Sequence, residues 1–140
     1  MTLSYDDLRT YQLQAVDYLI KNPRCGLWQD IGLGKTVATL TAIDLMKKQF
    51  DVSNVLVIAP LRIARKVWSD EIKKWEHLQH LTISKIVGSA SQREYALMTD
   101  ADIHTVNFEN LVWLTNHYRK KSESRMREPW PWDMIVIDEV

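Results

Sequence analysis

Apolar residues along the chain follow two spacings, one typical of amphipathic helices and the other of buried strands. Helical spacing is found in residues 8–19, 35–48, 68–75, 89–98 and 111–118. Short apolar or alternating runs, typical of strands, lie at 26–28, 55–59, 82–87, 103–106 and 134–137. The charged stretch at 119–129 is expected to be a solvated loop or a frayed helix end. The pattern therefore predicts helices that alternate with strands along the chain.

Two of these segments have well-defined ends. The first helix is expected to stop near Pro23, because proline restricts the backbone of the residue before it. Residues 55–59, VLVIA, form an unbroken apolar run that Pro60 ends, and such runs are typical of strands buried on both faces of a parallel sheet. Strands that alternate with helices imply right-handed crossovers. We therefore expect a three-layer α/β fold with a mainly parallel sheet.

A glycine-rich turn, QDIGLGKT at 29–36, joins an expected strand to an expected helix. Its glycines let backbone N–H groups turn toward phosphate oxygens, and the helix N-terminus adds its dipole. Lys35 is placed to reach the β- and γ-phosphates of ATP, and the Thr36 hydroxyl is the expected magnesium ligand. The predicted nucleotide-binding residues of this turn are Asp30, Gly32, Leu33, Gly34, Lys35 and Thr36.

Other readings of this turn are less favoured. The general phosphate-loop pattern GxxxxGKT has glycine where this chain has Gln29, a departure that many motor ATPases tolerate. A glycine-rich turn with a merely solvated lysine is the alternative, but the predicted strand-to-helix setting favours the phosphate loop. A dinucleotide-binding fingerprint is disfavoured, because the third glycine of GxGxxG would fall at Val37.

The last expected strand leads directly into Asp138 and Glu139. One carboxylate can hold magnesium, usually through water, and its neighbour can position or deprotonate the attacking water. We assign Asp138 to the metal, and Glu139 together with Lys35 to catalysis. An acidic strand end alone could be a solvated surface. It gains weight because it follows the phosphate loop in the order, and on the fold, that would bring the two together.

Gln12 lies in the first expected helix, upstream of the turn. A glutamine amide offers both a donor and an acceptor, which match the N6 and N7 edge of adenine. Gln12 could therefore select ATP over other nucleotides. A glutamine on the exposed side of a helix is the open alternative.

Composition limits the domain count and the cellular setting. A chain of 140 residues is long enough for one domain with its own core. It is too short for the two lobes that a translocating motor needs. The formal net charge is zero, so any grip on nucleic acid must come from a local basic face. Cys25 is the single cysteine, which excludes an intramolecular disulfide and fits a reducing compartment. The absence of a transmembrane-length apolar stretch or a signal peptide favours a cytoplasmic protein without a membrane partner.

Five segments follow one another along the chain: LRTYQLQAVDYL, GLWQDIGLGKT, VLVIAPLRIARKVWSDEIKKW, TVNFENLVWL and WPWDMIVIDE. In this order they resemble the N-terminal motifs of the Swi/Snf-like ATPases of helicase superfamily two, most closely the phage-type members. The resemblance implies that residues 1–140 are a single RecA-like lobe of the P-loop NTPase fold, cut after its acidic strand. It also implies DNA-stimulated ATP hydrolysis that drives translocation on duplex DNA without strand separation.

The resemblance carries roles over by position. Gln12 matches the adenine-reading glutamine, the turn with Lys35 and Thr36 matches the phosphate loop, and Asp138 and Glu139 match the magnesium and water residues. The implied cofactors are ATP and Mg²⁺. The implied partners are double-stranded DNA and a second RecA-like lobe, in cis or in trans. For a phage-encoded protein the implied location is the host cytoplasm.

The resemblance also places DNA contacts after the second strand and in the TVNFEN segment. The residues at these places are Arg62, Arg65, Lys66 and Asn107. The cations could engage backbone phosphates without reading sequence. A solvated helix face is the alternative, because nearby carboxylates partly offset the charge.

Aromatic residues and histidines add little to this assignment. Trp68 and Trp75 share an apolar helical face with Ile72, so core packing is favoured over base stacking. The roles of three others are open: Trp113, Trp130 and Trp132. The histidines show no metal-ligand spacing with the cysteine, so no zinc site is expected.

The family pattern continues beyond the residues present here, into a motif that couples hydrolysis to DNA and a second lobe with an arginine finger. An arginine finger contributes roughly 10³ to 10⁵ in rate, so we expect little or no hydrolysis by this chain. Its activity as an enzyme is left open. The final strand is expected to be central in the sheet, which would expose apolar surface and favour self-association.

Two other functions compete with the motor lobe. A non-catalytic nucleotide-binding or interaction module could regulate a partner, or complement one that supplies the missing lobe. A small P-loop kinase is disfavoured, because no arginine-bearing lid follows the acidic strand.

Overall fold

The computed structural model describes residues 2–21, 35–123 and 130–138, with side chains 121–123 left out. These residues form two compact units. The first comprises Met1–Ser53 and Lys66–Thr82, and the second comprises Asn54–Arg65 and Ile83–Val140. The strand expected at 26–28 and the cysteine at position 25 lie outside the described residues.

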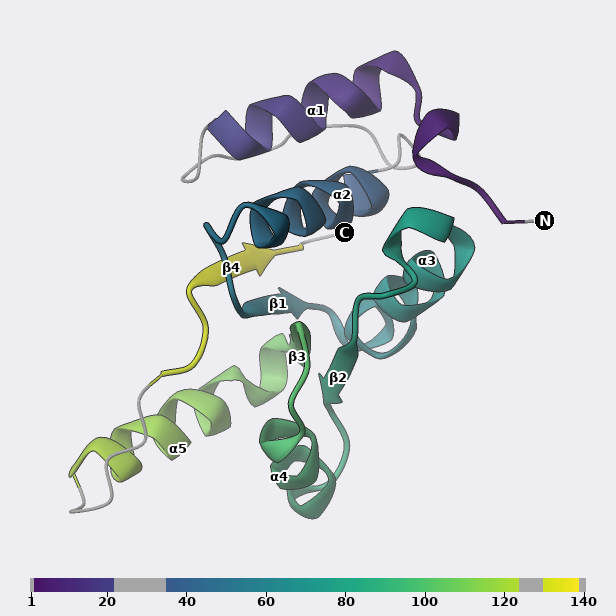
Figure 1. The fold of residues 1–140 in the computed structure, drawn as a ribbon. Coiled ribbons are helices and arrows are strands. Elements are labelled where there is room, and N and C mark those ends of the chain that lie inside the picture. Colours follow the sequence, from purple (N-terminus) through teal and green to yellow (C-terminus); the bar gives the residue numbers. More distant parts are fainter. Residues whose placement is uncertain (1, 22–34, 124–129, 139–140) are drawn as a thin grey trace. The chain divides into compact units, whose positions relative to one another are not determined.

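The first unit is helical, and its two longest helices pack side by side (Figure 1). They are α1 (Thr10–Lys21) and α2 (Lys35–Lys48), and the unit also contains α3 (Trp68–Lys74) with the 3₁₀ turns η1 (Tyr5–Asp7) and η3 (Glu76–Leu78). The helix predicted at 35–48 is confirmed at both ends. Of its 14 residues, eight are buried, which is more than one apolar face. Polar residues on α2 therefore need partners inside the protein.

Trp68 and Trp75 are only 2% and 5% exposed, so the prediction that they belong to the core is confirmed. Trp75 nevertheless stands outside the helix, because α3 ends at Lys74 and the backbone of Trp75 is extended. That conformation lets Trp75 form a parallel bridge with Leu3. The end of α3 is thus tied to the N-terminal segment.

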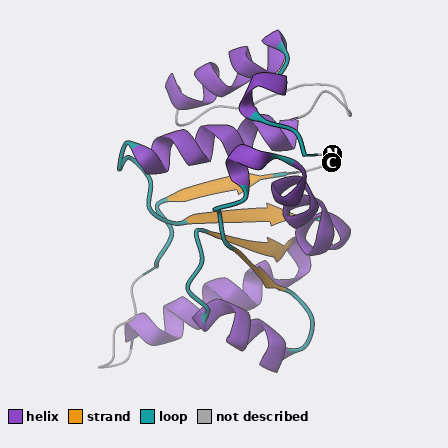
Figure 2. Ribbon diagram, turned by 45° about the vertical axis from the view of Figure 1, so that its right-hand side comes forward, coloured by secondary structure: helices purple, strands orange, loops and turns teal. Residues whose placement is uncertain are grey.

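The second unit contains a four-stranded, all-parallel sheet with the order β2-β3-β1-β4 (Figure 2). The strands are β1 (Val55–Ala59), β2 (Ile83–Ile86), β3 (Ile103–Asn107) and β4 (Met134–Ile137). In register, Val55 faces both Ile103 and Met134, and Ile83 also faces Ile103. The prediction of an α/β fold with a parallel sheet is confirmed. The carboxyl ends of all four strands therefore lie along the same side of the sheet, which we call its carboxyl edge.

One face of this sheet packs against α4 (Ala90–Met98) and α5 (Leu111–Glu123). The buried side chains of the cluster are Leu56, Ile58, Ile86, Ala96, Val106, Leu114, Tyr118 and Trp132. Every residue of β1 is buried, as predicted for its unbroken apolar run. α5 continues to Glu123, so the stretch predicted as loop or frayed helix end is helical in its first part.

β4 was expected to be central in the sheet, and among the described strands it pairs with β1 alone. Because the strand expected at 26–28 lies outside the described residues, the central position stays a prediction. The outward side chains of β4, Ile135 and Ile137, are 50% and 60% exposed.

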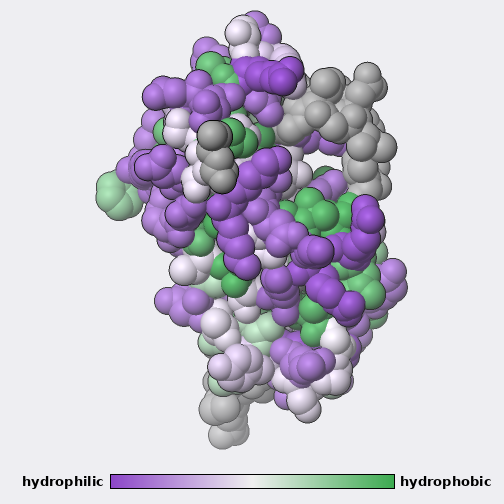
Figure 3. Space-filling view, turned by 90° about the vertical axis from the view of Figure 1, so that its right-hand side faces the viewer, coloured by the Kyte–Doolittle hydropathy of each residue, from purple (hydrophilic) through white to green (hydrophobic). Residues whose placement is uncertain are grey.

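Hydrophilic side chains cover much of the face shown in Figure 3, with apolar ones interspersed. Within the described residues, no helix has both the length and the apolar character needed to span a membrane.

Candidate functional site

Lys35 and Thr36 are the first two residues of α2, and both are half-buried. The start of a helix directs unpaired N–H groups and the positive end of the dipole toward whatever precedes it. This setting suits a phosphate ligand. The other predicted residues of the turn, and the predicted catalytic carboxylate, lie outside the described residues: Asp30, Gly32, Leu33, Gly34 and Glu139. Their roles stay predictions.

Gln12 lies on the first turn of α1 and is only 7% exposed. Its side-chain oxygen accepts a hydrogen bond of 2.8 Å from the backbone N–H of Arg9. This bond satisfies a donor at the helix start and fixes the orientation of the amide. The alternative of an exposed helix glutamine is therefore wrong, while adenine recognition stays a prediction.

The carboxyl edge of the parallel sheet gathers two of the predicted site residues. Asp138 directly follows β4, and its backbone N–H donates to the Ile58 carbonyl at 2.8 Å, which extends the pairing with β1. Asn107 ends β3 on the other side of β1. Ligands of open α/β sheets bind outside the carboxyl ends of the strands. Asp138 is half-buried at this edge of the sheet, where such a ligand would bind.

The side chain of Asn107 is 4% exposed and is used inside its own turn, η4 (Phe108–Asn110). Its Nδ2 donates to Glu109 at 2.7 Å, and its Oδ1 accepts from Asn110 at 2.6 Å. The backbone N–H of Glu109 and then the Asn107 amide stabilise the carboxylate, which holds the pKa of Glu109 below its ordinary value. Asn107 thus shapes the turn, and a direct DNA contact by its amide stays a prediction.

Arg62 and Arg65 lie on the segment that follows β1, and both are exposed. This segment includes the π-helical turn η2 (Ile63–Val67). It is anchored to the sheet, because the Thr105 hydroxyl of β3 donates to the Ala64 carbonyl at 2.7 Å. The two arginines therefore project from a fixed segment of the second unit. Lys66, which is also exposed, belongs to the first unit.

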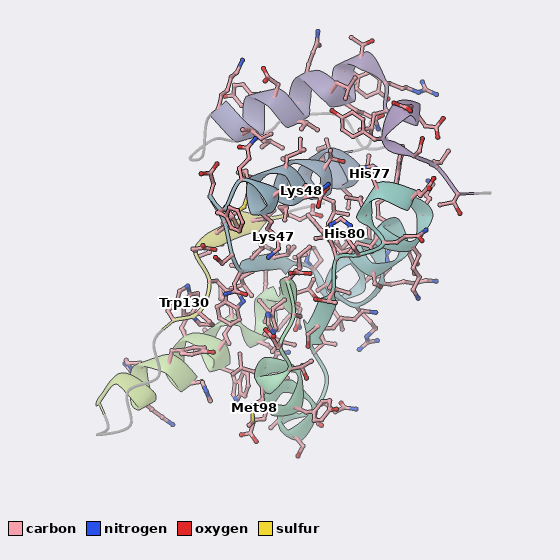
Figure 4. The ribbon with its side chains drawn as sticks, in the orientation of Figure 1. Lys47, Lys48, His77, His80, Met98 and Trp130 are labelled. Carbon is pink, nitrogen blue, oxygen red and sulfur yellow. The ribbon has the colours of Figure 1, made fainter. Side chains whose placement is uncertain are left out.

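A buried carboxylate on α2 was missed by the sequence reasoning. Asp44 is 3% exposed, and its two oxygens pair with His80 at 2.6 Å and Lys48 at 3.1 Å. Next to it, His77 shares a hydrogen bond of 2.9 Å with Thr41. Figure 4 shows both histidines beside α2. We call these five residues the Asp44 cluster. The only signal for it in the sequence is an acidic residue inside the mainly apolar stretch 40–46 of the helix.

Arg93 of α4 was also missed. Its guanidinium lies 4.7 Å from the centroid of the Trp113 ring, and its Nη1 donates to the Gly88 carbonyl at 2.7 Å. These contacts tie the turn after β2 to α5. They also give a role to Trp113, which the sequence left open.

The other two open tryptophans belong to an aromatic group at the amino-terminal edge of the sheet. Trp132 is 5% exposed, and its indole N–H donates to Nδ1 of His104 at 3.2 Å. Trp130, which is 38% exposed, packs edge-on against Trp132 and Tyr118. Trp132 is therefore core, and Trp130 covers it.

Comparisons of the sequence and of the structure with known proteins both find SNF2-type proteins. Residues 11–140 match the SNF2-related domain. Putative protein p41 of Acyrthosiphon pisum secondary endosymbiont phage 1 is 39% identical over 133 residues, which cover 94% of this chain and 27% of that protein. Chromatin remodeling factor mit1 of Schizosaccharomyces pombe is 29% identical over 140 residues, covering 94% of this chain and 10% of its own length.

The Sulfolobus solfataricus SWI2/SNF2 ATPase core in complex with dsDNA superposes with a TM-score of 0.67 at 26% identity, covering 94% of this chain and 26% of that one. The Sulfolobus solfataricus SWI2/SNF2 ATPase core domain gives a TM-score of 0.65 at 24% identity, covering 94% of this chain and 25% of that one. The chain thus spans about a quarter or less of the length of these relatives. Because the family match covers residues 11–140, the chain belongs to the SNF2-related domain family, and its fold agrees with that assignment.

Proposed function

We propose that this chain is the ATP- and Mg²⁺-binding first lobe of a Swi/Snf-like, DNA-dependent translocase. The observation that carries the proposal is the family match, which runs through residues 11–140 and through both compact units. Two features of the structure support it. α2 begins at Lys35, the first residue after the glycines of the sequence motif, and Asp138 directly follows a strand of a parallel sheet.

In this proposal, the turn and the start of α2 hold the phosphates of ATP, with Lys35 as the cation. Thr36 and Asp138 offer a hydroxyl and a carboxylate, the oxygen ligands that Mg²⁺ prefers. Glu139 orients the attacking water. Gln12 reads adenine with an amide whose orientation is fixed by Arg9. Mg²⁺, when bound, neutralises charge that develops on the phosphates.

Hydrolysis and movement require more than these groups. We propose that a second RecA-like lobe, in cis or in trans, supplies the arginine that stabilises the transition state. Double-stranded DNA is the proposed track. Its phosphates would be contacted by exposed cations after β1, Arg62 and Arg65 in the second unit and Lys66 in the first. The proposed location is the cytoplasm, that of the host if the protein is encoded by a phage.

A titration with a fluorescent ATP analogue tests the nucleotide site. Lys35→Ala is expected to weaken binding at least tenfold, on the order of the loss of one charge-assisted contact to phosphate. Lys73→Ala removes the same charge from an exposed position at the end of α3 and serves as the matched control. Equal affinity of wild type and Lys35→Ala would refute the assignment. Omission of magnesium is expected to weaken binding to wild type.

Competition by GTP tests Gln12 separately. Wild type is expected to prefer ATP, and Gln12→Ala is expected to lose most of that preference while it keeps magnesium-dependent binding. Because Gln12 also caps α1, thermal unfolding of the variant is measured in parallel. Loss of all nucleotide binding in a folded Gln12→Ala variant would contradict a role limited to the base.

A second candidate is a non-catalytic module that complements a partner protein. It is favoured by the apolar side chains of Ile135 and Ile137, which are exposed on β4, a strand that pairs with β1 alone among the described strands. An ATPase assay with duplex DNA separates the candidates. Turnover that rises with DNA after a second lobe is added supports the motor, and nucleotide binding without turnover under any such condition supports the module.

A further inference from the structure

A groove of about 740 Å³ follows the outer edge of β2 in the second unit. β2 pairs with β3 alone among the described strands, and α4 lies beside it (Figure 1). Two cations, Arg65 and Lys85, line the groove. All of its lining residues are described, and there is no carboxylate among them. We call this feature the β2 groove.

The two cations come from different elements but are held near each other through β3. Lys85 faces Thr105 in the register of β2 and β3, so both side chains point to the same face of the sheet. The Thr105 hydroxyl donates to the carbonyl of Ala64, which immediately precedes Arg65. Neither Arg65 nor Lys85 forms an ion pair with any described residue. Their charges are therefore available to an external ligand.

Part of the groove lining is a turn whose conformation is fixed by its own contacts. Gly88 has a positive φ of 92°, and a Cβ there would come within 2.2 Å of the Gln92 side-chain oxygen. That oxygen accepts from the Ser89 N–H at 2.8 Å, and the Ser89 hydroxyl accepts from the Gln92 N–H, which caps α4. The Arg93 guanidinium donates to the Gly88 carbonyl and lies over the Trp113 ring. The turn is thus set before any ligand arrives.

From this geometry we infer that the β2 groove binds the phosphate backbone of duplex DNA. The inference rests on the proposed function and extends its DNA surface from the segment after β1 to β2 and α4. Lys85 and Arg65 supply the charge, and the Ser91 hydroxyl, which lines the same groove, can donate to a phosphate oxygen. Tyr95, 79% exposed at the rim, offers its ring to a sugar.

Charge and continuity favour DNA over other occupants. An open strand edge flanked by cations could also accept an extended acidic peptide. Arg65, however, lies on the same short, anchored segment as Arg62, so the groove continues the surface already proposed for DNA. Contacts of this kind hold the backbone and carry no sequence information.

The test is the salt dependence of binding to a fluorescein-labelled duplex of about 20 base pairs, a length chosen to exceed one helical turn of DNA. Each cation that neutralises a phosphate contributes a slope of about 0.9 in the logarithmic plot of affinity against salt. Lys85→Ala is expected to lower the slope by about 0.9, and Arg65→Ala with Lys85→Ala by about 1.8. Lys85→Arg is expected to keep it.

The matched control removes two exposed lysines outside the groove, with Lys73→Ala and Lys120→Ala. It changes net charge by the same amount, and its slope is expected to stay within error of wild type. Thermal unfolding confirms that each variant is folded. A polyglutamate peptide, added as a competitor at equal charge concentration, is expected to displace the duplex poorly.

Three outcomes would overturn the inference. If the groove double variant, Arg65→Ala with Lys85→Ala, has the same salt-dependence slope as the control, the groove is not a DNA-binding site. The proposed function is unaffected by that result. A wild-type chain that does not bind duplex DNA would overturn both the groove and the DNA part of that function, and the ATP titration would still report on Lys35. Tight polyglutamate binding that the groove double variant loses would reassign the groove to an acidic peptide.

Discussion

The two units bury histidine in opposite ways. His104 of β3 has both ring nitrogens engaged: Nδ1 accepts from the Trp132 indole, and Nε2 lies 2.9 Å from the Thr99 carbonyl. Nδ1 must therefore be unprotonated and Nε2 protonated, which fixes one neutral tautomer. His77 of η3 has one nitrogen bonded to Thr41, while its buried Nδ1 has no partner among the described residues.

This difference reflects what surrounds each ring. His104 lies in an aromatic and apolar setting, where a neutral donor and acceptor complete the packing. His77 lies beside a charged set, in which the Asp44 carboxylate is buried on α2 and held by His80 and Lys48. The sheet is thus stabilised mainly by apolar burial. The helix α2 of the first unit depends on a buried charge and its partners.

Removal of Trp132 should have the largest effect on stability. Trp132→Ala deletes a large, 5% exposed side chain and leaves His104 without its donor. The expected loss is about 3–5 kcal/mol of unfolding free energy, which urea titration would measure. Trp130→Ala is the matched control, because that side chain is 38% exposed and should cost clearly less. Equal losses would show that Trp132 is not the centre of the aromatic group.

Removal of the charge on Asp44 should have an intermediate effect. Asp44→Asn keeps the size of the side chain but weakens its bonds to His80 and Lys48, for a loss of about 1–3 kcal/mol. The exposed pair Asp17–Lys21 has the same i, i+4 spacing on α1. Asp17→Asn is therefore the control, with an expected loss of at most about 0.5 kcal/mol. The comparison would fail if the two substitutions cost the same.

Acidification should have the smallest effect. Burial is the main cause that lowers the pKa of both His77 and His104 below 6.5, so the unfolded chain binds protons more readily than the folded one. The contribution of these two histidines to the free energy of unfolding is complete above pH 6.5. It is lost as the pH falls below 6.5 toward the lowered pKa of the folded state. Urea midpoints between pH 7.5 and pH 5 should therefore fall. His104→Gln and His77→Gln should each make the urea midpoint less dependent on pH. A steeper fall in either variant would contradict the downward direction of the pKa shift of that histidine.

Much of the fold could be predicted from local pattern. The ends of α2, β1 and β4 follow from where apolar spacing begins and ends, and the parallel sheet follows from alternation with an unbroken apolar strand. The candidate site was less accessible. The positions of Lys35, Thr36 and Asp138 at the ends of elements were predictable, because motif and element boundary coincide there.

The sequence by itself determined the family, the alternation of elements and the helix and strand ends that carry Lys35 and Asp138, because these depend on residues close together in the chain. The tertiary structure alone decided that Gln12 is buried, that Asp44 meets His80, that Arg93 lies over Trp113 and that β4 pairs with β1 alone among the described strands. Asp44 and His80 are 36 residues apart, and Trp132 and His104 are 28 apart. Such partners are chosen by packing and desolvation once the elements are assembled, and no local spacing encodes them.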